Sequence, residues 1–242
     1  RERSVARKLQ AGLLTTEMPD LGASEIGAVY EAADDEAEVG GDFYDVIELE
    51  DDRFGLVVGD VSGKGAEAAA QTAVVKYMLR AFALRNPAPA SALYDLNNAL
   101  ARDLAEDRFV TLMYAVFDPR QRRCSIAVAG HPPPLIYRRD RDEVDQVDTQ
   151  GPIMGAFEDQ RFEHVSAELA GGDVFLAYTD GLLEARSGEE FFGLDRIRSS
   201  LQRHARRSHA AEMARHIYED ARRFGQINDD TVVFVLAGKD RS

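Results

Sequence analysis

The stretch FYDVIELEDDRFGLVVGD, residues 43–60, consists of two apolar runs separated by two adjacent aspartates. Short runs of alternating apolar residues are typical of β-strands, and a polar pair between them indicates a tight turn. The stretch therefore predicts a β-hairpin over 43–50 and 53–60. The chain continues into GDVSGKG (59–65), which places three glycines, one aspartate and one lysine directly after the apolar run 56–58.

A glycine-rich turn with a lysine after a strand suggests a nucleotide phosphate site. A phosphate loop requires Gly, four residues, and then Gly-Lys-Ser/Thr. Here only three residues separate Gly59 from Gly63, and Gly65 follows Lys64 where the hydroxyl is needed. The dinucleotide pattern G-x-G-x-x-G does not fit either. What remains is Asp60 at the end of a strand, where it either holds a cation or caps the helix that follows.

The bulk composition excludes some classes of partner. The 242 residues are 45% hydrophobic and 30% charged, which suits a soluble protein with a sizeable core. The 43 acidic residues exceed the 29 basic ones and give a net charge of −14. This balance argues against binding to nucleic acid and to an anionic membrane surface, because both rest on Lys and Arg. It is compatible with the binding of metal cations.

Cys124 is the only cysteine, so an internal disulfide is excluded, and its setting in the strand-like RCSIAVAG favours a buried hydrophobe. We expect a reducing compartment. The sequence contains neither an apolar run long enough to span a membrane nor a signal peptide, so it predicts the cytoplasm. The chain begins with Arg1, not Met, and we expect it to be a fragment of a longer polypeptide.

The periodicity of apolar residues predicts an alternation of strands with pairs of helices. We expect helices over 2–14 and around 74–82, 93–104, 194–201 and 213–224, and further strands over 25–33, 109–117, 124–129, 135–137, 173–181 and 231–237. The strands over 109–117, 124–129 and 135–137 are expected to form one antiparallel meander. The many hairpins, and strands apolar on both faces, favour an α+β fold of covered antiparallel sheets over a doubly wound parallel sheet.

Aspartates stand beside glycine or another aspartate next to four of the apolar strands. They are Asp42 with Asp45, Asp60, Asp180, and Asp229 with Asp230. Each of them alone is explained by turn or cap chemistry. Carboxylates gathered at one edge would repel one another unless a cation is bound, and such hard oxygen ligands select Mg²⁺, Mn²⁺ or Ca²⁺. The five histidines are scattered and offer no zinc site together with Cys124.

The motifs GGDFYD, GDVSGKG, AGHPPPL, YTDGLLEA and NDD occur in this order over residues 40–230. This set resembles the SpoIIE/RsbU-type branch of the metal-dependent protein phosphatases, the PPM superfamily. VARKLQAGLL looks like the helix that precedes the domain in that family. The resemblance implies a four-layer α-β-β-α sandwich of two antiparallel sheets flanked by helices. It places a linker or regulatory helix at 1–14 and the phosphatase domain at 15–242.

The same resemblance implies a two-metal site. Its ligands for two Mn²⁺ or Mg²⁺ ions would be Asp42, Asp60, the backbone carbonyl of Val61, Asp180 and Asp229. Asp230 is either an alternative ligand or a residue that supports the ligands. Lys64 either contacts the substrate phosphate or is a solvated lysine at the start of a helix.

The function implied by the resemblance is the hydrolysis of phosphoserine or phosphothreonine by a metal-activated water. The implied substrate is a phosphorylated anti-sigma-factor antagonist of the STAS type, in bacterial partner switching. An upstream sensor domain and a homodimer through the N-terminal helix are implied as well. Two alternatives remain open: a regulatory pseudophosphatase, against which the retained aspartates argue, and a calcium-stabilised binding module without turnover.

Overall fold

The computed structural model describes residues 18–32, 40–104, 108–206 and 208–239. They divide into two compact units whose sequences interleave. The described residues of the first unit are 18–19, 40–104, 108–131 and 148–167, and those of the second are 20–32, 132–147, 168–206 and 208–239.

The first unit is built on a five-stranded sheet in the order β2-β3-β4-β5-β8. These strands are β2 (Phe43–Glu48), β3 (Phe54–Val61), β4 (Val110–Asp118), β5 (Arg123–Ala129) and β8 (Val165–Glu168). The strands from β2 to β5 pair antiparallel, each with the next. The predicted hairpin is confirmed: the 3-10 turn η1 (Glu50–Asp52) joins β2 to β3 and contains two aspartates with positive φ.

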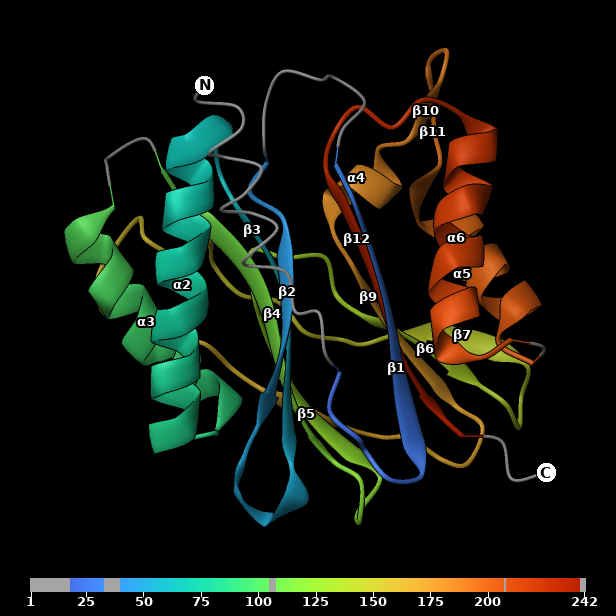
Figure 1. Ribbon diagram of the computed structural model, residues 1–242, viewed down its shortest axis with the longest axis horizontal. Helices are drawn as coiled ribbons and strands as arrows, with labels where there is room; N and C mark the ends of the chain where they lie inside the picture. Colours follow the sequence, from blue (N-terminus) through green and yellow to red (C-terminus); the bar gives the residue numbers. More distant parts are fainter. Residues whose placement is uncertain (1–17, 33–39, 105–107, 207, 240–242) are drawn as a thin grey trace. The chain divides into compact units, whose positions relative to one another are not determined.

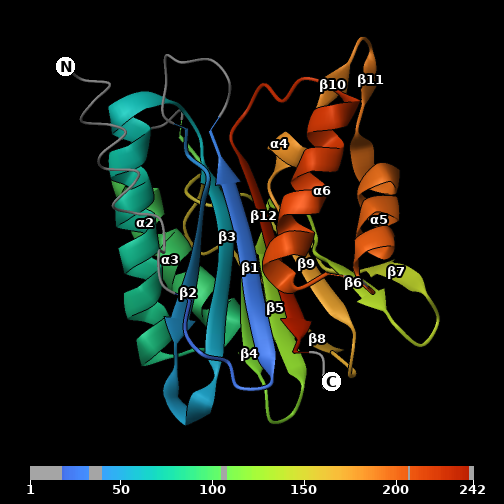
Figure 2. The same cartoon turned by 45° about the vertical axis from the view of Figure 1, so that its right-hand side comes forward.

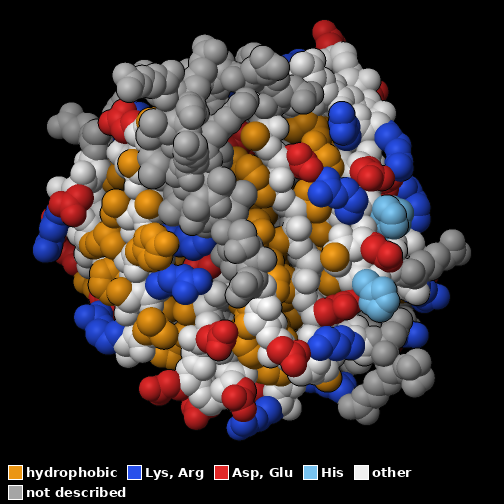
Figure 3. Space-filling view, in the orientation of Figure 1, with side chains coloured by type: hydrophobic (Ala, Val, Ile, Leu, Met, Phe, Trp, Pro, Cys, Tyr) orange, Lys and Arg blue, Asp and Glu red, His pale blue; other side chains and the backbone are white. Residues whose placement is uncertain are grey.

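Helices α2 (Gly65–Arg85) and α3 (Pro89–Asp103) cover one face of this sheet (Figure 1). Both helices were expected from the sequence, and their apolar residues pack with those of the sheet into one core. The outer side of α2 is apolar too. Its Val74, Tyr77 and Leu84 are 51%, 58% and 61% exposed. Figure 3 shows hydrophobic side chains at the surface where α2 lies in Figure 1.

The second unit is built on a sheet in the order β1-β12-β9-β6-β7. These strands are β1 (Ser24–Glu31), β12 (Thr231–Gly238), β9 (Val174–Tyr178), β6 (Leu135–Arg138) and β7 (Glu143–Gln146). Neighbouring strands pair antiparallel throughout. The first described strand therefore lies beside the last one, with Tyr30 opposite Val232.

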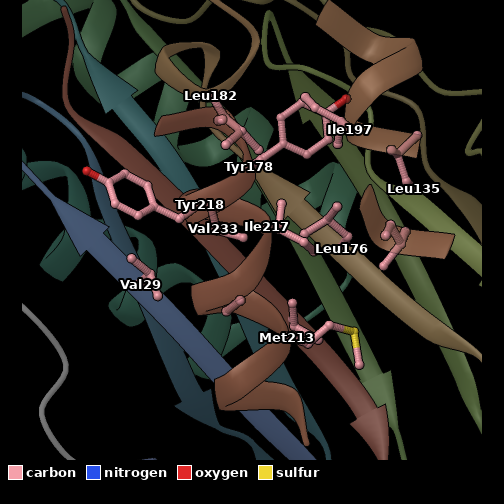
Figure 4. Close-up of a cluster of buried hydrophobic side chains, with 14 of the residues drawn as sticks. Val29, Leu135, Leu176, Tyr178, Leu182, Ile197, Met213, Ile217, Tyr218 and Val233 are labelled. Atoms are coloured by element: carbon pink, nitrogen blue, oxygen red, sulfur yellow. The ribbon is translucent and has the colours of Figure 1, made fainter. Parts of the chain in front are cut away.

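Helices α5 (Gly193–His204) and α6 (Ala210–Phe224) lie side by side on this second sheet (Figure 2). Figure 4 shows how their side chains meet those of the strands. Ile197, Met213 and Ile217 come from the helices, and Leu176 and Val233 come from the strands. All five are almost completely buried, so the burial of apolar surface holds helices and sheet together.

Shorter elements complete the second unit. The four-residue helix α4 (Asp180–Leu183) begins one residue beyond β9, after Thr179. β10 (Arg186–Ser187) pairs with β11 (Glu190–Phe191) in a small hairpin. The isolated bridge between Arg186 and Gln226 ties this hairpin to the segment that leads into β12. As a result, the segment that contains Asp180 and the segment that contains Asp229 are held close together.

The expected meander is wrong in one strand. The strands over 109–117 and 124–129 do pair, as β4 and β5. The strand over 135–137 is β6, and it pairs with β7 and β9 in the sheet of the second unit. The reason lies in the connection Gly130–Pro134, in which three successive prolines cannot turn back as a tight hairpin and instead carry the chain away. Within the described residues, β8 is the other neighbour of β5.

The predicted helix over 2–14 lies outside the described residues, and the domain boundary at residue 15 stays a prediction. The fold class is confirmed: two antiparallel sheets, each with helices on one face. Among the described helices, none combines the length and the apolar character that crossing a membrane requires.

Candidate metal centre

Asp42 and Asp60 lie next to each other at one end of the first sheet. The ladder between β2 and β3 begins with Phe43 opposite Gly59, and the two aspartates are the next residues on either strand. Carboxylate oxygens of Asp42 and Asp60 lie within 4.8 Å of one another. Asp42 is buried, with 4% of its surface exposed. Two carboxylates this close favour the binding of a cation between them.

The carbonyl oxygen of Val61 lies close to the Asp60 carboxylate, because both flank the backbone of Gly41. A Cβ built at Gly41 would collide with this carbonyl oxygen and lie only 2.7 Å from Oδ1 of Asp60. The Val61 N–H donates to the Gly41 carbonyl at 3.2 Å. Glycine is therefore required at position 41, because only its bare backbone lets these oxygen donors come together. Such an oxygen set suits a hard divalent cation.

Asp45 does not share this site, although the sequence grouped it with Asp42. Side chains alternate along β2, so Asp45 points to the face that α2 covers. There its carboxylate accepts hydrogen bonds from Arg80 and lies 3.3 Å from the ammonium of Lys76. Burial lowers the pKa of Lys76, and Asp45 partly opposes this shift. The bond to Asp45 raises the pKa of Arg80. Asp45 therefore joins strand to helix.

The stretch GDVSGKG forms the turn from β3 into α2. Gly63 and Gly65 have φ of 106° and 88°, which glycine adopts without strain. Lys64 lies between them as the residue before the first turn of α2, and its side chain is exposed. The turn therefore serves to present Asp60 and Val61, and Lys64 extends from it into solvent.

A second acidic group belongs to the second unit. Asp180 is the first residue of α4 and lies two residues after the end of β9, and Asp229 lies two residues before β12. The side-chain oxygen of Thr179 accepts a hydrogen bond from the Val232 N–H at 2.8 Å. A Cβ at Gly181 would collide with the carbonyl oxygen of Asp230. The two strand ends are thus held together, and their aspartates become neighbours.

The electrostatics of this second group show carboxylate crowding. Desolvation and the negative charge of Asp229 raise the pKa of Asp180, although its side chain keeps access to solvent. Desolvation and the charges of Asp180 and Asp229 also raise the pKa of Glu184. A bound cation would relieve this repulsion. Glu184 was missed in the sequence, where its spacing of four residues from Asp180 on a helical turn was the available signal.

Asp230 differs from Asp229 in its surroundings. It is 3% exposed, and its Oδ2 accepts a hydrogen bond from the Tyr30 hydroxyl at 2.7 Å. Its own N–H donates to Oδ1 of Asp229 at 2.9 Å. These contacts favour a supporting role for Asp230, which orients its neighbour, over that of an alternative ligand.

Cys124 and His131 offer no competing chemistry. Cys124 is completely buried in β5, and burial raises the pKa of its thiol, which disfavours the reactive thiolate. The imidazole of His131 lies 3.2 Å from the hydroxyl of Thr111 and is 5% exposed. This buried contact indicates that His131 braces the turn to which it belongs.

Two solved structures have the same fold as this chain. The RsbU and RsbW domains of a Mycobacterium tuberculosis protein match 90% of this chain and 61% of the solved chain, with a TM-score of 0.78 and 28% identity. The PP2C phosphatase domain of SpoIIE from Bacillus subtilis matches 88% and 63%, with a TM-score of 0.75 and 24% identity. The chain thus has the fold of the PP2C-type phosphatases.

The sequence model of Stage II sporulation protein E (SpoIIE) matches residues 50–238, so the chain belongs to the SpoIIE family of phosphatases. It is also similar to the phosphoserine phosphatase RsbU of Bacillus subtilis, with 26% identity over 240 residues. That match covers 98% of this chain and 70% of RsbU. The chain spans less than two thirds of either solved chain.

Proposed function

We propose that the chain is a metal-dependent protein serine/threonine phosphatase. Asp42, Asp60 and the carbonyl of Val61 would come from the first unit, and Asp180 and Asp229 from the second. Together they would hold two Mn²⁺ or Mg²⁺ ions. The observation that carries the proposal is the close approach of Asp42, Asp60 and the Val61 carbonyl around Gly41. Carboxylate and carbonyl oxygens gathered in this way are the donors that a hard divalent cation prefers.

When bound, two such cations supply Lewis acidity at the phosphoryl group and a water of lowered pKa. The residues of the chain provide the arrangement. Asp42 and Asp60 would provide carboxylate oxygens to the ions, and Asp230 would orient Asp229 through its N–H. Lys64, which is exposed on the same turn as Asp60, would contact the substrate phosphate.

The substrate class follows from the relatives. We infer a phosphoserine or phosphothreonine on a signalling protein, because RsbU is a phosphoserine phosphatase. The finer assignment is an anti-sigma-factor antagonist of the STAS type. In the full-length protein, a sensor domain would act through the N-terminal helix, which would also form a homodimer.

The test is the release of phosphate from a phosphoserine protein and from an aryl phosphate, with Mn²⁺ and after thorough chelation. We expect turnover that requires Mn²⁺ or Mg²⁺. Asp195→Asn is a matched control, because this aspartate is exposed on α5 and should leave turnover unchanged. Full activity after chelation would refute the metal dependence. Metal binding without phosphate release would favour the pseudophosphatase, and melting stabilised by Ca²⁺ alone would favour the binding module.

A further inference from the structure

Arg108 lies just before β4 and contacts the turn that follows Asp60. The regular ladder between β3 and β4 ends with Val61 opposite Val110. One residue further, the Ser62 N–H still donates to the Phe109 carbonyl at 3.0 Å. In the other direction the Phe109 N–H donates to the side-chain Oγ of Ser62 at 2.9 Å. In a regular ladder the Phe109 N–H would donate to the carbonyl of Ser62. Here the Oγ of Ser62 accepts this hydrogen bond instead, and the carbonyl is left for another donor.

The carbonyl of Ser62 is bound by Arg108 instead. Nη1 of Arg108 donates to this oxygen at 2.6 Å, and the arginine side chain is 17% exposed. Nη2 reaches Glu67 in the first turn of α2 at 3.3 Å, but Glu67 is 72% exposed. A charge-assisted hydrogen bond away from water is strong, whereas an ion pair with an exposed partner contributes little. The hydrogen bond to the Ser62 carbonyl is therefore the main contact by which Arg108 holds the turn.

Gly63 is matched to this arrangement. Its φ of 106° requires glycine, and a Cβ built there would collide with the Arg108 guanidinium. Arg108 thus fills the space that the missing side chain leaves. The turn is closed on one side by Gly41, which contacts the Val61 carbonyl, and on the other by Arg108.

We propose that Arg108 is a positioning residue for the metal centre. It holds the turn from Val61 to Gly63 against β4 and so keeps Asp60 and the Val61 carbonyl directed at one point. This inference rests on the proposed function, because it concerns ligands named there. Without Arg108 the turn, which also carries Lys64, is free to move, and metal affinity falls. At saturating Mn²⁺ the bound ions would hold Asp60 and the Val61 carbonyl in place, so KM for the substrate is kept.

The experiment compares Arg108→Met, Arg108→Lys and Glu67→Gln in the whole chain. Calorimetry gives the Kd for Mn²⁺, and phosphate release gives kcat and KM at saturating Mn²⁺. We expect R108M to raise the Kd for Mn²⁺ on the order of tenfold, with an unchanged KM. R108K should show an intermediate Kd, because lysine lacks the planar pair of donors. E67Q should match the wild type. Hydrogen exchange at the Ser62 and Phe109 amides should be faster in R108M.

Each outcome decides a different point. A folded R108M with a wild-type Kd for Mn²⁺ overturns the proposal. An unchanged Kd with a raised KM also overturns it, because Arg108 would then bind the substrate phosphate. If R108M does not fold, R108K decides: it should raise the Kd about threefold, and a wild-type value counts against the proposal. A wild-type chain that neither binds Mn²⁺ nor releases phosphate refutes the proposed function instead.

Discussion

Asp45 on β2 and Lys76 on α2 form an ion pair inside the first unit, with Nζ 3.3 Å from Oδ1 and side chains that are 1% and 6% exposed. Arg80, one helical turn later, donates to the same carboxylate. The strand that begins after Asp42 is thereby tied to the helix that begins after the turn of Asp60. The segments of the first unit that carry the proposed ligands Asp42 and Asp60 are thus linked by the ion pairs of Asp45.

Replacement of Asp45 by Asn should destabilise the protein strongly. It leaves the ammonium of Lys76 buried without its counter-charge, which costs about 3–5 kcal/mol for a broken buried pair. Urea unfolding in the presence of chelator measures the free energy of unfolding. Asp95→Asn is the matched control, since its pair with Arg85 is partly exposed and should contribute less than about 1 kcal/mol. Equal losses in the two variants would contradict a buried ion pair.

Replacement of Asp60 by Asn should abolish turnover while the fold survives. The variant loses a proposed metal ligand, but without metal it also loses the repulsion between Asp42 and Asp60. In chelator its melting temperature should therefore equal or exceed that of the wild type, and added Mn²⁺ should raise it less. Thermal melts with and without Mn²⁺, together with phosphate release, check both parts. Turnover near the wild-type rate would remove Asp60 from the ligand set.

Asp229→Asn should lower the pKa of Asp180 in the metal-free protein. The shift of Asp180 arises from desolvation and then from the charge of Asp229, and the variant removes only the second cause. Side-chain NMR titration in chelator measures the change, and Glu184 should follow in the same direction. A pKa of Asp180 that does not move would show that burial alone sets it.

The raised pKa of Asp180 also makes the stability of the metal-free protein depend on pH. At pH values between the ordinary carboxyl pKa of 3.8 and the raised pKa of Asp180, this side chain is more fully protonated in the folded metal-free protein than in the unfolded chain. The contribution of Asp180 to the free energy of unfolding therefore falls as pH rises through that window. Wild-type protein in chelator should lose this contribution with rising pH, and the D229N variant should lose less of it.

The helix predicted over residues 2–14 should control activity. Val5, Leu9 and Leu13 form an apolar stripe in the sequence that a lone short helix cannot bury. We expect the isolated chain to have low turnover and weak affinity for its second metal. A coiled coil fused before Arg1 should raise turnover in a compatible register, because two packings need differ by only a few kcal/mol. Unchanged turnover in all seven registers would make the helix purely structural.

Much of the fold could be predicted because it depends on local patterns. The hairpin of β2 and β3 follows from two apolar runs around Asp51 and Asp52, and the helix pairs follow from the spacing of their apolar residues. The positions of Asp42, Asp60, Asp180 and Asp229 beside strands also follow from the chain alone. These features need only neighbouring residues, so the sequence contains them directly.

The tertiary structure decided what depends on distant partners. It placed the strand 135–137 in the second sheet, because strand pairing joins residues far apart in the chain. It separated Asp45 from Asp42, because the charge that Asp45 meets comes from α2, and no local pattern in β2 names that helix. It brought Arg108 to the turn of Asp60, because β4 lies beside β3 only once the sheet has formed. The sequence determines which side chains stand at the strand ends, whereas the packing of strands and helices determines which distant residues they meet.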